Sequence, residues 1–181
     1  MSAIIVELNP DRTLGGELRI VKSDGTQEGY GLSVLGKAAY NDAGLHGNPS
    51  ANQLVLYGDT PTGTYSVLEI TNGPYRGNAH SYGPNGVIKM APTSGNAATA
   101  AANGRTGLLI QGGDLGAGGL LRRTNGCLRL SNEEFLYLKN TVLSISISDP
   151  ADVVKVLDTG NVSNQSFNND TCGDGDPPFG L

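Results

Sequence analysis

The sequence predicts a mainly β protein, and three observations lead to this prediction. Glycine occurs 27 times among 181 residues, tryptophan is absent and charged residues make up only 16% of the chain, a composition that favours a turn-rich β domain over a helical bundle. Short apolar runs recur between glycines, prolines and asparagines, as in strands joined by turns. A chain of this length suits one domain with a core of its own.

The first half of the chain has the clearest strand pattern. Asn9-Pro10 and Gly15-Gly16 mark one turn, and the SDGT segment at residues 23–26 marks another, because these residues favour turn conformations. The segment at residues 37–53 has no regular apolar period and is expected to form a loop. Strands are predicted at residues 3–8, 17–22, 30–36, 53–58 and 64–70.

The second half mixes strands with helices. An alanine-rich segment at residues 93–104 predicts a short helix that ends at Asn103-Gly104, since glycine favours helix ends. Ser131 and Glu134 have the spacing of a capping box, which predicts a helix at residues 132–140. Further strands are predicted at residues 86–90, 107–113, 141–148 and 153–157, and residues 120–123 look strand-like.

Residues 1–159 are expected to form the domain, and residues 160–181 a polar C-terminal tail. The tail has little to bury. Its carboxylates, in NNDTCGDGD, lack the ordered spacing of a calcium loop. The sequence therefore predicts no metal site.

Charge and hydropathy limit the partners of the chain. The net charge is −5 without a block of basic residues, which argues against nucleic acid, because backbone binding requires a clustered basic face. No apolar stretch approaches a membrane span, and residues 3–6 are too short for the apolar part of a signal peptide. The localisation is left open: cytoplasmic, exported by another route, or shortened at the N-terminus.

Two cysteines, Cys127 and Cys172, are too few for a disulfide framework. Cys127 follows Gly126 on an expected tight turn before a helix, where the helix N-terminus favours a thiolate. The backbone amides of residues 125–127 would then be placed to stabilise an oxyanion. The alternative is that Cys127 is a small buried hydrophobic residue, which is common for cysteine.

The segment TNGCLRLSNEEFLYL, residues 124–138, resembles the active-site signature of the L,D-transpeptidases. That signature has Ser or Thr, a variable residue, Gly-Cys, an apolar residue, often Arg, and then a helix that carries Asn or Asp. A second marker of this family, a TPTG-type turn before a strand, matches residues 60–63, which Tyr65 follows closely. The resemblance covers approximately residues 4–148.

A third marker is altered. The family has a strand that ends in His-Gly before the cysteine, and this chain has Gln111-Gly112 there, with Gln111 sixteen residues before Cys127. Glutamine cannot take a proton at neutral pH, and general-base help is worth ~10²–10⁴-fold in rate. His80 is the candidate replacement base and Asp114 a weaker one, whereas His46 is expected to be a loop residue.

The resemblance implies a β-sandwich with a mixed sheet and one helix after the cysteine turn. It also implies a cysteine acyltransferase for peptidoglycan stem peptides, in the cell envelope or periplasm, with Cys127 as nucleophile and no cofactor. Transfer of the acyl group to an amine or to water would give an L,D-transpeptidase or an L,D-carboxypeptidase. Catalysis is assigned to Cys127, Gln111, Gly126 and Asn125, and substrate contacts to Arg129, Gly112, Tyr82 and His80.

Three functional hypotheses follow. The first is an active enzyme in which His80, or prior ionisation of Cys127, replaces the missing base. The second is a peptidoglycan-binding module whose catalysis is impaired because Gln111 replaces histidine. The third is a toxin delivered to the cell wall of a competitor, suggested by the missing signal peptide.

Overall fold

The structure is a computed structural model that describes residues 1–159. The tail predicted at residues 160–181, which includes Cys172, lies outside the described residues. Within residues 1–159, no helix is long and apolar enough to cross a membrane.

A single mixed sheet of eight strands organises the chain, in the order β3-β2-β1-β8-β4-β5-β6-β7. The β1–β8 and β6–β7 pairs are parallel and the other neighbours are antiparallel. The mainly β prediction with a mixed sheet is therefore confirmed. The strands are β1 (Ala3–Leu8), β2 (Gly16–Val21), β3 (Gln27–Val34), β4 (Gly63–Ile70), β5 (Val87–Ser94), β6 (Leu109–Gln111), β7 (Leu128–Arg129) and β8 (Val153–Asp158).

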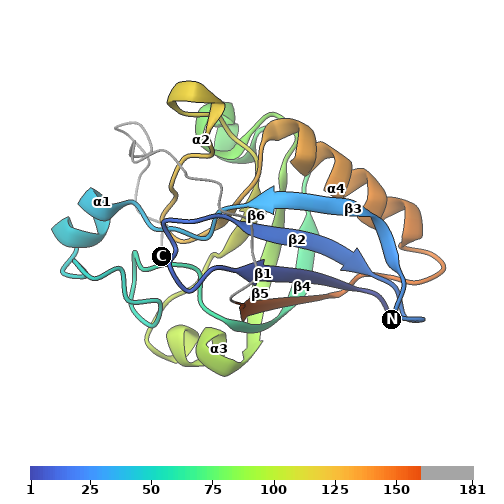
Figure 1. The fold of residues 1–181 in the computed structure, drawn as a ribbon, viewed down its shortest axis with the longest axis horizontal. Coiled ribbons are helices and arrows are strands. Elements are labelled where there is room, and N and C mark those ends of the chain that lie inside the picture. The colour runs from blue at the N-terminus through green and yellow to red at the C-terminus, as the bar shows by residue number, and fades with distance from the viewer. Residues whose placement is uncertain (160–181) are drawn as a thin grey trace.

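The sheet folds over itself, so that β1–β3 lie in front of β4–β6 in Figure 1. Its two edges meet at a bridge between Leu35 and Arg129, whose backbone amides each donate to the other's carbonyl at 2.9 Å. Alternate residues of β1, namely Ile4, Val6 and Leu8, are buried, as expected for strands with one face in a core. A single apolar cluster takes side chains from all eight strands, which gives the sandwich its interior.

The longest described helix, α4 (Asn132–Ile145), follows the cysteine turn, as predicted. Ser131 caps it, because its Oγ accepts from the Glu134 amide at 3.1 Å and contacts the Glu134 carboxylate at 3.0 Å. Phe135, Leu138 and Val142 bury the inner face of the helix in the core. The other helices are α1 (Tyr40–Leu45), α2 (Ala79–Tyr82) and α3 (Gly95–Ala102), with 3₁₀ turns at Tyr75–Gly77 and Ala117–Gly119.

Four local predictions are wrong. Residues 53–58 form an irregular loop rather than a strand, and residues 120–123 are not a strand either. The expected loop at 37–53 contains α1. The alternating segment at 141–148 continues α4 to Ile145, because Val142 and Ile145 pack on the core at helical spacing.

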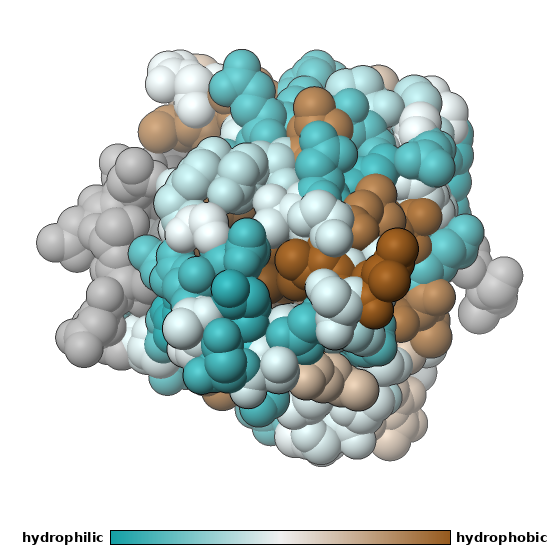
Figure 2. Space-filling view, turned by 90° about the vertical axis from the view of Figure 1, so that its right-hand side faces the viewer, coloured by the Kyte–Doolittle hydropathy of each residue, from teal (hydrophilic) through white to brown (hydrophobic). Residues whose placement is uncertain are grey.

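Exposed apolar residues mark the side on which α4 ends. Leu143 is 46% exposed and Ile147, just beyond the helix, is 98% exposed. Figure 2 views this side and shows hydrophobic surface in its centre with hydrophilic residues around it. Patches of this kind are common on soluble domains and assign no function by themselves.

Candidate active site

The ends of β6 and β7 have two different faces. Ile110 and Leu128 pair across the strands and join the main core. Because side chains alternate along a strand, their neighbours Leu109, Gln111 and Arg129 point to the opposite face. Cys127 packs with Leu109 there, so the strand ends bring the nucleophile candidate and the candidate base position to one side of the sheet.

A tight turn leads into Cys127. The Thr124 Oγ1 accepts from the Gly126 amide at 3.0 Å and donates to the Cys127 carbonyl at 2.9 Å. Gly126 has a φ of +97°, a conformation that favours glycine. The Gly126 carbonyl accepts from the Thr60 hydroxyl at 2.8 Å, so the segments at residues 60–63 and 124–127 are in direct contact. Because the Gly126 amide is occupied by Thr124, it is not available to the oxyanion for which it was considered.

The Arg105 guanidinium lies directly behind this turn. A Cβ added to Gly126 would lie 1.9 Å from the Arg105 Nη2 and 2.2 Å from the Gly58 carbonyl oxygen. Arg105 is 2% exposed and donates to the carbonyls of Gln53, Gly58 and Asp59 at 2.6, 2.6 and 2.8 Å. A buried cation held by carbonyls rather than carboxylates therefore adjoins the cysteine turn.

The charge of Arg105 interacts with nearby groups that can carry negative charge. Burial lowers the pKa of Arg105, and the negative charges of Tyr65, Cys127 and Asp59 counteract this shift. Burial raises the pKa of Tyr65, whose hydroxyl donates to the Pro61 carbonyl at 2.6 Å. Since electrostatic attraction is mutual, the Arg105 guanidinium favours the ionised form of Cys127.

Apolar side chains surround Cys127 and have the opposite effect. Cys127 is 1% exposed and packs with Tyr82, Val87 and Leu109, and Tyr75 stacks edge-on against Tyr82 with ring centroids 5.3 Å apart. The exposed sulfur expected of a nucleophile is therefore not observed. Desolvation favours the neutral thiol, so Arg105 and this apolar cluster act against each other.

Gln111 is held in one orientation. Its side chain is 3% exposed, and its Nε2 donates to the Ser81 carbonyl at 3.3 Å. That acceptor fixes which end of the amide is nitrogen. The Gln111 Oε1 is then buried with no hydrogen-bond partner in the part of the chain that the structure describes, so the candidate base position holds an acceptor that cannot take a proton.

Arg129 ties three segments together. It is 1% exposed, its Nη1 donates to the Ser81 carbonyl, and its Nη2 donates to the Asp114 carbonyl at 2.8 Å. Gly113 allows this approach, since a Cβ there would lie 2.3 Å from the guanidinium. Arg129 was expected to contact substrate, whereas in this geometry its guanidinium ties the segments beside the cysteine turn together.

His80 lies at the edge of the site in an ordered pair. Its Nδ1 contacts the Asp114 carboxylate, and the Arg122 Nη1 lies 3.0 Å from its Nε2. Because a guanidinium only donates, His80 Nε2 is assigned as the acceptor and Nδ1 as the protonated nitrogen. Its side chain is 51% exposed, unlike the buried Cys127. His46 stacks on Tyr57 instead, as a loop residue.

The remaining predicted residues also fall around this face. Tyr82 contacts Cys127 within the apolar cluster. Gly112 packs against Asn132, whose Oδ1 accepts from the Gly113 amide at 2.7 Å. Asn125 lines a small pocket of about 60 Å³, together with Arg105 and Leu108. No group of three His, Cys, Asp or Glu side chains able to hold a metal occurs within residues 1–159.

Sequence reasoning did not identify Arg105. It follows Asn103-Gly104 in a predicted helix end and has no local motif. Its partners lie 46 to 52 residues earlier in the chain, so only the fold reveals its position.

The chain is similar to solved protein structures. No protein-family model matches the chain, and no curated protein matches it. The crystal structure of Mycobacterium tuberculosis L,D-transpeptidase 1 is similar with a TM-score of 0.41 and 11% sequence identity. The match covers 86% of this chain and 62% of that chain. At this distance the similarity says nothing about activity.

Proposed function

We propose that the chain is a cysteine acyltransferase that acts on peptidoglycan stem peptides, with the acyl-enzyme on Cys127. The observation that carries this proposal is the buried Arg105 guanidinium against Gly126. A cysteine beside a cation gains thiolate character without a neighbouring base. The Arg105 charge would thus supply what Gln111 cannot.

The proposed reaction begins with transfer of an acyl group from the stem peptide to Cys127. The Cys127 Sγ attacks the carbonyl carbon of the stem peptide, a C–S bond forms and the amide C–N bond breaks. The leaving amine takes up the proton that the thiol released on ionisation. A second amine or a water molecule then resolves the thioester, as in other acyl transfers through cysteine.

The His80–Asp114 pair has the tautomer that a proton-transfer group requires. The His80 Nε2 is an acceptor and Asp114 orients the ring through Nδ1, the arrangement found in base-orienter pairs. Arg122 donates to the same Nε2, so His80 would have to give up this hydrogen bond before it could exchange a proton with the substrate or the leaving group. The choice of stem peptide as substrate rests on the TNGCLRLSN and TPTG segments, which contact each other through Thr60 and Gly126.

Intact-protein mass spectrometry with a carbapenem tests the proposal. The chain is expected to form a one-to-one covalent adduct that Cys127→Ala abolishes and Cys172→Ala leaves unchanged. A tetrapeptide stem should release D-alanine with the same dependence. An adduct that persists in Cys127→Ala would refute the assignment of the nucleophile.

A second candidate function is a peptide-binding module without turnover, and the anchored Gln111 favours it. This function predicts stem-peptide binding by calorimetry, with no carbapenem adduct in the wild-type chain. It also predicts an adduct in Gln111→His, where a base is restored. Adduct formation by the unmodified chain would exclude it.

A further inference from the structure

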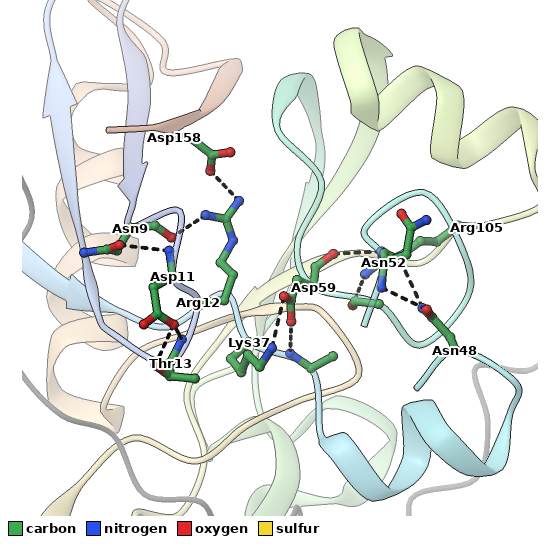
Figure 3. Close-up of polar contacts among 12 residues, drawn as sticks. Asn9, Asp11, Arg12, Thr13, Lys37, Asn48, Asn52, Asp59, Arg105 and Asp158 are labelled. Atoms are coloured by element: carbon green, nitrogen blue, oxygen red, sulfur yellow. Dashed lines mark hydrogen bonds and ion pairs between the residues drawn. The ribbon is translucent and has the colours of Figure 1, made fainter. Parts of the chain in front are cut away.

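A polar pocket of about 230 Å³ lies where the turn after β1 faces the loop of residues 48–59. Figure 3 shows Arg12 and Asp158 on one side of this region and Asn52 on the other, with Asp59 between them. None of the lining side chains belongs to the segments around Cys127. The lining includes Arg12, Ala51, Asn52, Gln53, Asp59 and Asp158.

Arg12 lines this pocket and is held in place by contacts within the chain. Its side chain is only 6% exposed, its Nη1 donates to the Asn9 carbonyl at 2.6 Å and its Nη2 pairs with the Asp158 carboxylate at 2.5 Å. Its Nε is buried and has no acceptor among residues 1–159. Because this Nε is enclosed by protein, the donors left for a ligand are those of the other lining side chains.

Two carboxamides provide these donors. The Asn52 Oδ1 accepts from the Leu54 amide at 2.9 Å, and the Gln53 Oε1 accepts from the Thr62 amide at 2.8 Å. These bonds fix both amide planes through their oxygens. The two NH₂ groups make no hydrogen bond within the described part of the chain and remain available for a ligand in the pocket.

The acceptors in the pocket are carboxylates with fixed positions. The Asp59 Oδ1 accepts from the Ala38 amide at 2.8 Å, and its Oδ2 pairs with Lys37 at 3.2 Å. Asp158 is held by Arg12. Asp158 pairs with Arg12, and Asp59 pairs with Lys37, which is not a lining residue, so neither carboxylate faces a ligand as an isolated charge.

The loop that carries these groups is rigidly held. Arg105 donates to four of its carbonyls, and the Asn48 side chain bonds to both the amide and the carbonyl of Asn52. Ala51 is buried with a φ of +52°, a strained conformation for a residue with a Cβ. A fixed constellation of donors and acceptors loses little entropy when a ligand binds.

We propose that this pocket binds one ring of an uncharged saccharide. Hydroxyl groups both donate and accept, which matches amide donors set beside paired carboxylates. Because both carboxylates are already paired with cations, the pocket favours a neutral ligand rich in hydroxyl groups over an anion. The site is independent of the acyl transfer proposed for Cys127.

The test is a two-dimensional ¹H–¹⁵N NMR titration of the full chain with chitotriose and, separately, with maltotriose. Shifts are expected in the amides of residues 9–13 and 51–59 and in the side-chain NH₂ signals of Asn52 and Gln53. A response to chitotriose alone assigns an acetamido sugar, and a response to both assigns a general hydroxyl site. Absence of shifts with both sugars at millimolar concentration overturns the proposal.

The key variant is Gln53→Glu, which keeps the oxygen that the Thr62 amide needs and replaces the NH₂ donor. It is expected to weaken binding about tenfold, as the loss of one well-placed hydrogen bond would. Asn140→Asp, an equal charge change on exposed α4, should bind like wild type. Equal binding by Gln53→Glu and Asn140→Asp contradicts the assignment, and an unperturbed spectrum of Gln53→Glu without ligand confirms that the variant is folded.

Discussion

Arg105 and Arg129 lie on either side of the Cys127 turn and are both almost completely buried, yet they are used differently. Arg129 lies on β7 and spans the Ser81 and Asp114 carbonyls, joining α2 to the segment after β6. Arg105 binds the carbonyls of the 53–59 loop and packs its guanidinium against Gly126.

The difference shows that the arginine within the sequence motif is not the one whose charge acts on Cys127. Arg129 belongs to the family-like TNGCLR segment, and its geometry is that of a structural tie. Arg105 belongs to no motif, and its charge interacts with Cys127. Removing each arginine in turn should therefore separate stability from thiol reactivity.

The largest effect is expected for Gly126→Ala. Its Cβ would overlap the Arg105 guanidinium and the Gly58 carbonyl, and its φ of +97° disfavours any side chain. We expect a loss of about 4 kcal/mol in the free energy of unfolding, measured by urea denaturation. Gly118→Ala, with a φ of +68° and no atoms near its Cβ, should cost about 1 kcal/mol. Similar losses in both variants would mean that Arg105 is not tightly packed against the turn.

Arg105→Met is expected to reduce both stability and reactivity. It leaves the carbonyls of Gln53, Gly58 and Asp59 without their donor, at a cost of about 3 kcal/mol. Carbapenem acylation of Cys127 should slow at neutral pH, while Arg105→Lys, which keeps the charge, should retain most of the rate. Equal acylation rates in the Met and Lys variants would show that the charge has no role.

Arg129→Lys should affect stability alone. A lysine cannot span both carbonyls, so about 2 kcal/mol should be lost with one charged hydrogen bond. The pH dependence of Cys127 alkylation should stay that of wild type. A shift in that dependence as large as the Arg105→Met shift would remove the distinction between the two arginines.

Ser131→Ala provides the smallest perturbation near the site. Loss of the helix cap should cost about 1 kcal/mol, visible as a lower thermal midpoint by circular dichroism. Carbapenem acylation should be unchanged, because Ser131 contacts Glu134 rather than the cysteine turn. Slower acylation in this variant would indicate that general loosening of the domain, rather than charge, controls Cys127.

Local patterns were enough for much of the fold. The alternation in residues 3–8 and the Ser131–Glu134 capping box depend on neighbours in sequence, and both predictions are confirmed. Residues 53–58 look like a strand, but the side chain of Arg105, 52 residues after Gln53, holds them as a loop together with the nearby Asn48. The apolar pattern of residues 141–148 is compatible with a strand or a helix. The helix is formed because Val142 packs on the core.

Local sequence patterns also predicted part of the candidate site. The fold brings Cys127, Gln111, Tyr82 and Arg129 to one region, because strand pairing follows from the apolar pattern. The burial of Cys127 depends on Val87 and Leu109 from other strands. The contact of Arg105 with Gly126 depends on a loop whose shape no local rule gives.

The most direct test of the central claim is the rate of iodoacetamide alkylation of Cys127 between pH 5 and 10, in a Cys172→Ala background. The rate should follow the thiolate fraction, and the curves of the parent, Arg105→Lys and Arg105→Met are compared at a temperature where all three are folded. Because a neighbouring cation favours the thiolate, the account predicts a midpoint at higher pH in Arg105→Met and little change in Arg105→Lys. Three coincident curves would contradict the account and leave Cys127 as a buried thiol without activation.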